Sequence, residues 1–218
     1  MDKRIITVRG TGEVSAAPDS TVLTMTLNTL DKDYDRAVST AAELLEKLRE
    51  ALRGAGFEEK DLKTSNFNVR SEYESIRDEN GTYKSAFSGY ACTHGLKLEF
   101  DFDTDRLSKA LKAISGCLAD PQLSVRFTVK DRAALEEALL KSAAENAKRK
   151  AEVLTKAAGV GLGDLLRIDY DFAELSVYSR TEFCMEDRCM AKGNGAALDF
   201  EPEDISLSDS ASFTWEIA

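Results

Sequence analysis

Hydrophobic and polar residues alternate along several stretches of the chain, as they do in a strand with one buried face. The alternation is clearest over residues 90–102, 123–130 and 205–217. Residues 5–14, 21–30, 62–76 and 165–172 are rich enough in apolar and β-branched side chains to predict further strands. Because the alternation continues to residue 217, we expect the chain to end in a strand.

Turn residues between these stretches predict two hairpins. Pro18 and Asp19 separate the first two strands, and proline both fixes φ and removes a backbone donor. Asn80 and Gly81 form the favoured two-residue turn between residues 62–76 and 84–102.

Three other segments have the three- and four-residue apolar spacing of helices. They cover residues 33–55, 104–115 and 131–158. Asp31 or Asp33 is placed to cap the first of them, and Asp131 the last. In the last helix we expect a buried stripe of Leu135, Leu139, Ser142, Val153, Leu154 and Ala157. Its middle is narrow and allows close packing, because it contains Ala143, Ala144, Ala147 and Ala151.

The predicted order is ββαββαβαβ, which indicates the α+β class. We expect a mostly antiparallel or mixed sheet with two long helices and one short helix packed on it. Without a sharp change in composition, residues 1–218 are interpreted as a single domain of two closely packed halves. Residues 177–203 lack periodicity and are interpreted as a long irregular loop.

Composition excludes several classes of function. The formal net charge of −10 disfavours nucleic-acid binding, since phosphate contacts need a basic surface. The sequence contains no stretch of about 18 apolar residues, so no membrane span is expected. The first residues lack the apolar core of a signal peptide. They predict a cytoplasmic protein, or an exported one if a leader has been removed.

The Gly10-Thr11-Gly12 sequence is similar to the start of a dinucleotide-binding loop. Such a loop must connect a strand to a helix N-terminus, whereas a proline turn and another strand follow here. A twisted or bulged strand is therefore the better interpretation. No cofactor is expected.

The chain has four cysteines and one histidine. Cys184 and Cys189 flank a short acidic segment and form a speculative redox loop, but no second cysteine pair completes a structural zinc site, so no metal is expected. His94 shares its strand face with Cys92 and is interpreted as a packed, hydrogen-bonded core residue. A nucleophile–base pair of Cys92 and His94 is the alternative. We expect no catalytic residues.

Five segments, in order along nearly the whole chain, carry a family resemblance: residues 6–19, 55–65, 90–98, 143–163 and 201–205. The most specific is the Gly-x-Gly-Glu-Val opening followed by Pro18-Asp19. Together they resemble the SIMPL domain family, which includes the YggE-like and Brucella outer-surface-antigen-like proteins. In the last segment, Glu203 stands where that family often has a glycine.

The resemblance implies a bacterial protein of unestablished biochemical role, with links to stress tolerance and to assembly into homo-oligomers. We therefore expect a non-enzymatic, self-associating protein, with a protein partner of unknown identity. One alternative is a thiol- or metal-responsive protein acting through Cys184 and Cys189. Another is an enzyme with a cleft site near His94.

Overall fold

The computed structural model describes residues 4–77, 83–171, 175–185 and 201–218. The fold is α+β, as predicted, with three α-helices and two antiparallel sheets among these residues. The described part of the chain divides into two compact units. Of the described residues, unit 1 holds 4–19, 128–171, 175–180 and 202–218, and unit 2 holds 20–77, 83–127, 181–185 and 201. How closely the two halves pack stays a prediction.

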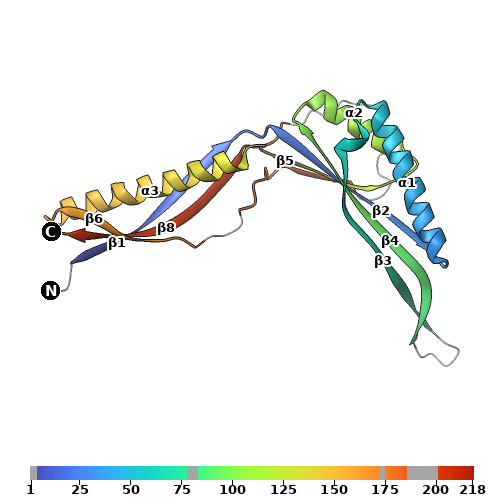
Figure 1. Cartoon of the computed structure of the whole chain (residues 1–218), viewed down its shortest axis with the longest axis horizontal. Helices are drawn as coiled ribbons and strands as arrows, with labels where there is room; N and C mark the ends of the chain where they lie inside the picture. The colour runs from blue at the N-terminus through green and yellow to red at the C-terminus, as the bar shows by residue number, and fades with distance from the viewer. Residues whose placement is uncertain (1–3, 78–82, 172–174, 186–200) are drawn as a thin grey trace. The chain divides into compact units, whose positions relative to one another are not determined.

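Unit 1 is a three-stranded sheet with one long helix along one of its faces (Figure 1). The strand order is β1 (Ile5–Ala16), β8 (Ile205–Ile217) and β6 (Leu162–Asp169). The register of β1 on β8 runs without interruption from Ile5↔Glu216 to Ala16↔Ile205. The helix is α3 (Arg132–Ala157). Together they enclose an apolar cluster of Val8, Ala147, Ala151, Ala211, Phe213 and Trp215.

Small residues bring α3 unusually close to β1. A Cβ atom on Gly12 would lie 2.2 Å from the carbonyl oxygen of Leu139, closer than any real contact. The buried residues of α3 recur every four positions as Leu135, Leu139, Ala143, Ala147, Ala151 and Thr155. The expected burial of Val153, Leu154 and Ala157 is wrong, since the first two are 62% and 52% exposed and Ala157 is exposed as well. The alanines face the sheet because they permit this short separation.

Polar side chains of α3 cover the free edge of β1. The Asn146 Oδ1 accepts a hydrogen bond from the Thr11 backbone N–H at 3.1 Å. Ser142 Oγ accepts one from the Glu13 N–H at 3.3 Å, and Lys150 Nζ donates to the Arg9 carbonyl at 3.2 Å. The backbone groups that an edge strand leaves unpaired thus find hydrogen-bond partners in three side chains of α3 that are spaced four residues apart.

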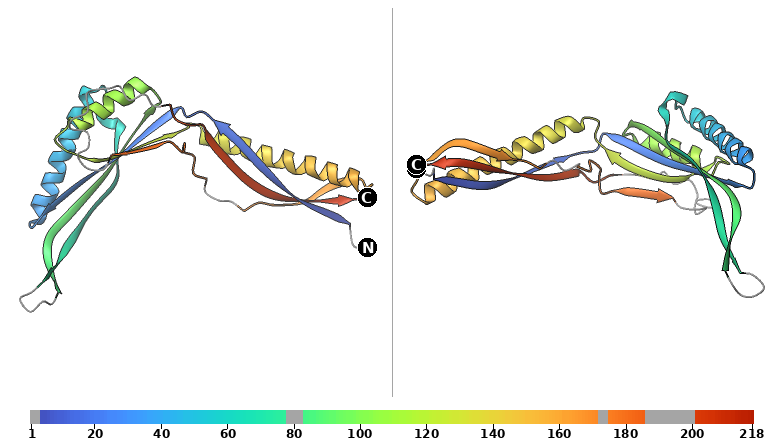
Figure 2. Two further views of the ribbon diagram at one scale, coloured as in Figure 1. Left: turned by 180° about the vertical axis from the view of Figure 1, so that it is seen from behind. Right: turned by 60° about the horizontal axis from the view of Figure 1, so that its bottom comes forward.

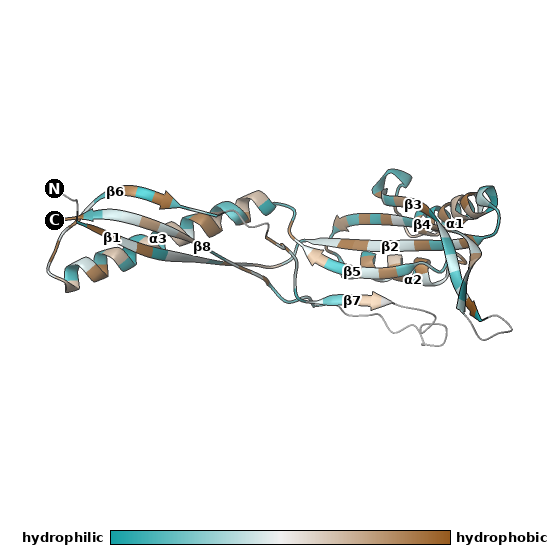
Figure 3. Cartoon of the chain, turned by 90° about the horizontal axis from the view of Figure 1, so that it is seen from below, coloured by the Kyte–Doolittle hydropathy of each residue, from teal (hydrophilic) through white to brown (hydrophobic). Residues whose placement is uncertain are grey.

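Unit 2 is a five-stranded sheet in the order β3-β4-β2-β5-β7. Its long hairpin, β3 (Leu62–Arg77) and β4 (Tyr83–Asp101), was predicted and runs past the end of α1 in each view (Figures 1 and 2). The other strands are β2 (Ser20–Asp31), β5 (Gln122–Thr128) and β7 (Glu182–Met185). Hydrophobic and hydrophilic residues alternate visibly along β2 and β4 (Figure 3).

Helices α1 (Tyr34–Gly54) and α2 (Thr104–Ser115) pack on this sheet, and a single 3₁₀ turn, Glu59–Asp61, follows α1. The apolar face of α2 packs inward, since Leu107, Leu111 and Ile114 are buried. The largest core side chains of unit 2 include Leu23, Met25, Leu27, Leu48, Leu96, Leu98, Leu107 and Phe127.

The structure corrects two expectations about the strands. The first two strands form no hairpin, because β1 pairs with β8 and β2 pairs with β4. The turn residue Asp19 is held elsewhere: its N–H donates to the Thr128 carbonyl at 3.1 Å, and its Oδ1 accepts from the Lys130 N–H at 2.8 Å. In addition, β7 is a short strand inside the stretch 177–203, of which residues 186–200 lie outside the described part.

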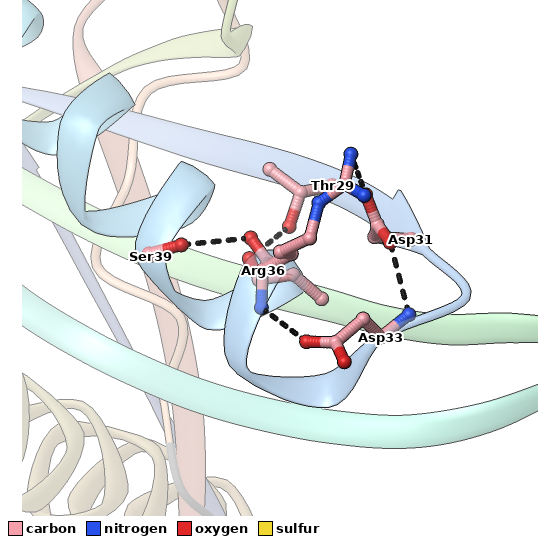
Figure 4. Close-up of polar contacts among 6 residues, drawn as sticks. Thr29, Asp31, Asp33, Arg36 and Ser39 are labelled. Atoms are coloured by element: carbon pink, nitrogen blue, oxygen red, sulfur yellow. Dashed lines mark hydrogen bonds and ion pairs between the residues drawn. The ribbon is translucent and has the colours of Figure 1, made fainter.

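Short-range polar contacts fix the start of α1 (Figure 4). Asp33, one of the two predicted candidates, is the N-cap, and its Oδ1 accepts from the Arg36 N–H at 3.0 Å. Asp31 Oδ1 accepts from the Asp33 N–H at 2.9 Å, and its other oxygen lies 3.3 Å from Arg36 Nη2. Because these bonds tie the helix to the end of β2, the first helical residue, Tyr34, is held beside the sheet.

Candidate functional site

Four aromatic side chains form a continuous row on unit 2, which we call the aromatic row: Tyr34, Tyr90, Phe87 and Tyr73. Successive ring centroids lie 5.6, 5.2 and 5.7 Å apart, and each pair meets edge to face. This geometry is favourable for aromatic pairs, so the row is ordered rather than a set of loose side chains. Three of the four rings are nevertheless exposed, Tyr73 by 61%.

A bulge in β4 gives the row its common face. Residue Tyr73 pairs with Phe87, and Ser71 pairs with Tyr90, so Ser88 has no partner of its own in β3. One extra residue reverses the alternation of side chains, and Phe87 and Tyr90 therefore point to the same side although they are three positions apart. A regular strand would place them on opposite faces.

The aromatic row lies next to an open sheet edge. Strand β3 is 16 residues long and is the outermost strand of its sheet, and nearly all its residues are exposed. The hairpin arms also carry other exposed apolar side chains, Phe67, Ile76 and Tyr83. Exposed aromatic groups beside unpaired strand edges are typical of surfaces that bind another chain.

His94 is buried in unit 2, 6% exposed, and shares a hydrogen bond of 3.0 Å with Thr64. The Phe67 ring meets its imidazole edge to face at 5.1 Å. Its Nδ1 has no hydrogen-bond partner among the described residues. Burial lowers the pKa of His94 from 6.5, and the positive charge of Arg49 lowers it further. The imidazole is therefore held in its neutral form.

Cys92 lies on the same face of β4 and is 1% exposed. Burial raises the pKa of the Cys92 thiol, against a smaller opposite effect of its hydrogen bond with Thr29. Since the thiolate is the nucleophilic form, this thiol is poorly activated. Within the described residues no hydrogen bond joins Cys92 to His94, so the geometry gives no support to a nucleophile–base pair.

The predicted redox loop is seen only in part. Cys184 is exposed and lies in β7, opposite Ser124 of β5, rather than in a loop. Cys189 lies outside the described residues. Cys117 is half-buried, and its Sγ accepts a hydrogen bond from the Ala119 N–H at 3.3 Å. The redox role of Cys184 and Cys189 therefore stays a prediction.

The Gly10-Thr11-Gly12 sequence has a packing role. Residues Gly10 and Gly12 lie within a regular strand and face α3. Of the two interpretations from the sequence, a twisted or a bulged strand, the bulge is absent from the described β1. The neighbouring backbone is a helix side and not a helix N-terminus, which a pyrophosphate would require. Ala143 and Ala147 of α3 make the same contact from the helix side.

The described residues 4–77, 83–171, 175–185 and 201–218 contain no cluster of three or more His, Cys, Asp or Glu side chains arranged to hold a metal ion. Within the same ranges, none of the helices combines the length and hydrophobicity needed to span a membrane.

Comparison with known proteins places this fold in a family. The chain is 27% identical over 163 residues to the 26 kDa periplasmic immunogenic protein of Brucella melitensis biotype 1. It is 26% identical over 163 residues to the protein of the same name from Brucella abortus strain S19. Each match covers 75% of this chain but only 65% of the relative. The profile of the SIMPL family, described as a protein of unknown function (DUF541), matches residues 6–215, and the chain belongs to this family.

Proposed function

We propose that this protein is a non-enzymatic protein that associates with copies of itself through the aromatic row and the neighbouring edge of β3. The main observation in support is that the aromatic row is ordered by its own ring contacts and yet exposed to solvent. Burying such side chains against a second copy removes apolar area from water at about 25 cal/mol per Å². An isologous contact between two hairpins would use the same surface twice.

The net charge of −10 sets a condition on this association. Two copies repel each other at low ionic strength, and salt screens that repulsion over a Debye length of about 10 Å at 0.1 M. The apolar contacts of the aromatic row are not weakened by salt in the same way. Association is therefore expected to strengthen as the salt concentration rises.

The periplasmic location in the names of the two Brucella relatives supports the proposal that this protein is exported. The comparisons give no support to the cytoplasmic expectation. A stress-related role and a separate protein partner stay predictions, since neither can be assigned to particular residues of the structure.

The test is the absolute mass in solution, measured by light scattering behind size exclusion over a wide range of protein and salt concentrations. The wild-type chain should form a defined oligomer, and the double variant Tyr73→Ser/Phe87→Ser should lose most of it. Leu118→Ser is the control, because Leu118 is 86% exposed in the same unit but away from the row. Circular dichroism should show that all three chains are folded. A monomer under every condition, or a variant of wild-type mass, would contradict the proposal.

Exposure of the Cys184 thiol favours one second candidate, a thiol-responsive protein. The same measurement separates the two functions. An oligomer that forms only without reductant and disappears in Cys184→Ser would point to the thiols. An oligomer that is indifferent to reductant would support the aromatic row.

A further inference from the structure

Unit 1 has an apolar groove that the self-association proposal does not use. It lies where α3 leaves β8 and β6 uncovered, has a volume of about 240 Å³, and is lined by Leu140, Ala144, Ile168, Ala211 and Phe213. Most of the residues of α3 that contact the sheet face β1, which leaves this side of the sheet partly bare. Leu140 and Ile168 are exposed on its two walls. The volume is below the range of about 300–1,000 Å³ for drug-sized ligands, so the groove fits a smaller molecule.

The surface of the groove is almost entirely apolar, and one carboxylate residue belongs to its lining. Asp209, the polar exception in the apolar alternation of β8, reaches the groove, and its Oδ2 accepts a hydrogen bond of 2.9 Å from the Tyr170 hydroxyl. Its other oxygen accepts from the Ser210 N–H at 2.7 Å. A carboxylate offers about four acceptor sites, so two remain for a ligand.

A second carboxylate acts on Tyr170. The hydrogen bond to Asp209 is the main cause that raises the pKa of Tyr170, followed by desolvation and by the charge of Asp209, and the charge of Glu136 adds the smallest part. Glu136 is on α3 one turn before Leu140. Neither Asp209 nor Glu136 forms an ion pair with a Lys or Arg in the part of the chain that the structure describes. Asp209 is therefore a carboxylate on the lining of the groove without a positive partner among the described residues, and Glu136 lies outside that lining.

We infer that this groove binds a small molecule with an apolar body and a protonated primary amine. The ammonium group then contacts Asp209, and the hydrocarbon chain lies between α3 and β6. Charge selects the cation, because an ammonium group donates three hydrogen bonds and a carboxylate only accepts them. Shape selects the body, because the walls of the groove offer apolar contacts alone. The inference concerns unit 1 and does not depend on the aromatic row.

Hexylammonium is a suitable probe, and 1-hexanol is its uncharged counterpart of nearly equal length. Trp215, the single tryptophan of the chain, reports on the groove because its ring stacks on Phe213 with a centroid distance of 5.7 Å. Hexylammonium should change Trp215 emission in a saturable way, with an affinity roughly tenfold higher than that of hexanol. Asp209→Asn should reduce the hexylammonium affinity to that of hexanol.

A second variant keeps the inference falsifiable if Asp209→Asn fails to fold. Ala144→Leu fills the groove from the helix side and should abolish the binding of both probes. Ala133→Leu is its control, because Ala133 is an exposed residue of the same helix outside the groove. The inference is overturned if neither probe saturates, if hexanol binds as tightly as hexylammonium, or if Ala144→Leu binds like the wild type.

Discussion

A Cβ atom placed on Gly10 would lie 2.1 Å from the carbonyl oxygen of Ala143 and 2.6 Å from the Ala147 Cβ. Both obstacles belong to the buried face of α3, one of them to its backbone, so neither can rotate away. The close approach of β1 to α3 therefore requires glycine at this position because of space, although its backbone conformation is that of an ordinary strand.

Gly10→Ala is accordingly expected to destabilise the protein by about 1–3 kcal/mol, the usual cost of overpacking, or by more if α3 separates from the sheet. Urea unfolding followed by Trp215 fluorescence measures the change. Gly54→Ala is the matched control, since an added Cβ there meets nothing within 4 Å. As a helical substitution it should be neutral or stabilise by up to about 1 kcal/mol. Equal effects of the two variants would contradict the packing role.

Burial of the neutral His94 makes stability depend on pH. Its pKa is lowered in the folded protein, whereas it is about 6.5 in the unfolded chain, so the unfolded chain binds the proton more tightly. The contribution of His94 to the free energy of unfolding should be fully present above about pH 6.5. It should be lost as the pH drops from there through the pKa of His94 in the folded protein. Urea unfolding between about pH 8 and 5 measures this slope.

His94 is the single histidine of the chain, so one substitution tests the origin of that slope. His94→Gln keeps a polar group near Thr64 but cannot titrate. The variant should be less stable at pH 8 and nearly independent of pH down to about pH 5.5, where carboxylates begin to titrate. A wild-type slope in His94→Gln would assign the effect to other groups.

Local features of the fold could be predicted from the sequence. Asp33 and Asp131 cap their helices as expected, because a cap is decided by a carboxylate and the next three residues. The pairing of β1 with β8 could not, since it joins Val8 to Phe213 across almost the whole chain. The apolar pattern also predicted a buried Val153, because such a pattern takes account of hydrophobicity alone. The contact of α3 with Gly10 instead requires small side chains on the buried face of the helix.

The aromatic row was missed for a related reason. Tyr73 and Phe87 are recognisable as apolar residues of a hairpin, but alternation assigns Phe87 and Tyr90 to opposite faces. The unpaired Ser88 reverses that assignment, and no feature of the sequence marks it as the bulge except the following Gly89. His94, by contrast, was placed in the core from its position in the alternation, and its hydrogen bond to Thr64 agrees with that interpretation.

The thiols of Cys92 and Cys184 should differ in reactivity by orders of magnitude. Cys184 is exposed, whereas Cys92 is buried and its pKa is raised. Iodoacetamide labelling, mapped to each cysteine by peptide mass spectrometry, should modify Cys184 in the native protein and Cys92 only after unfolding in urea. Labelling of native Cys92 at the rate of Cys184 would show that β4 opens readily or that the thiol is activated.

The covered edge of β1 supplies the last prediction. Asn146→Ala removes the acceptor for the Thr11 N–H, a partly buried contact of 3.1 Å. A net loss of about 0.5–1.5 kcal/mol is expected, because the backbone donor is left without a partner beneath the helix. Lys148→Ala is the control: Lys148 is exposed on the same helix, and alanine favours helix, so its effect should stay within about 0.5 kcal/mol. Hydrogen exchange adds a readout at the site itself, since the Thr11 amide should exchange faster in Asn146→Ala than in Lys148→Ala. Equal exchange of Thr11 in the two variants would mean that α3 shields this edge by its position alone, without the hydrogen bond.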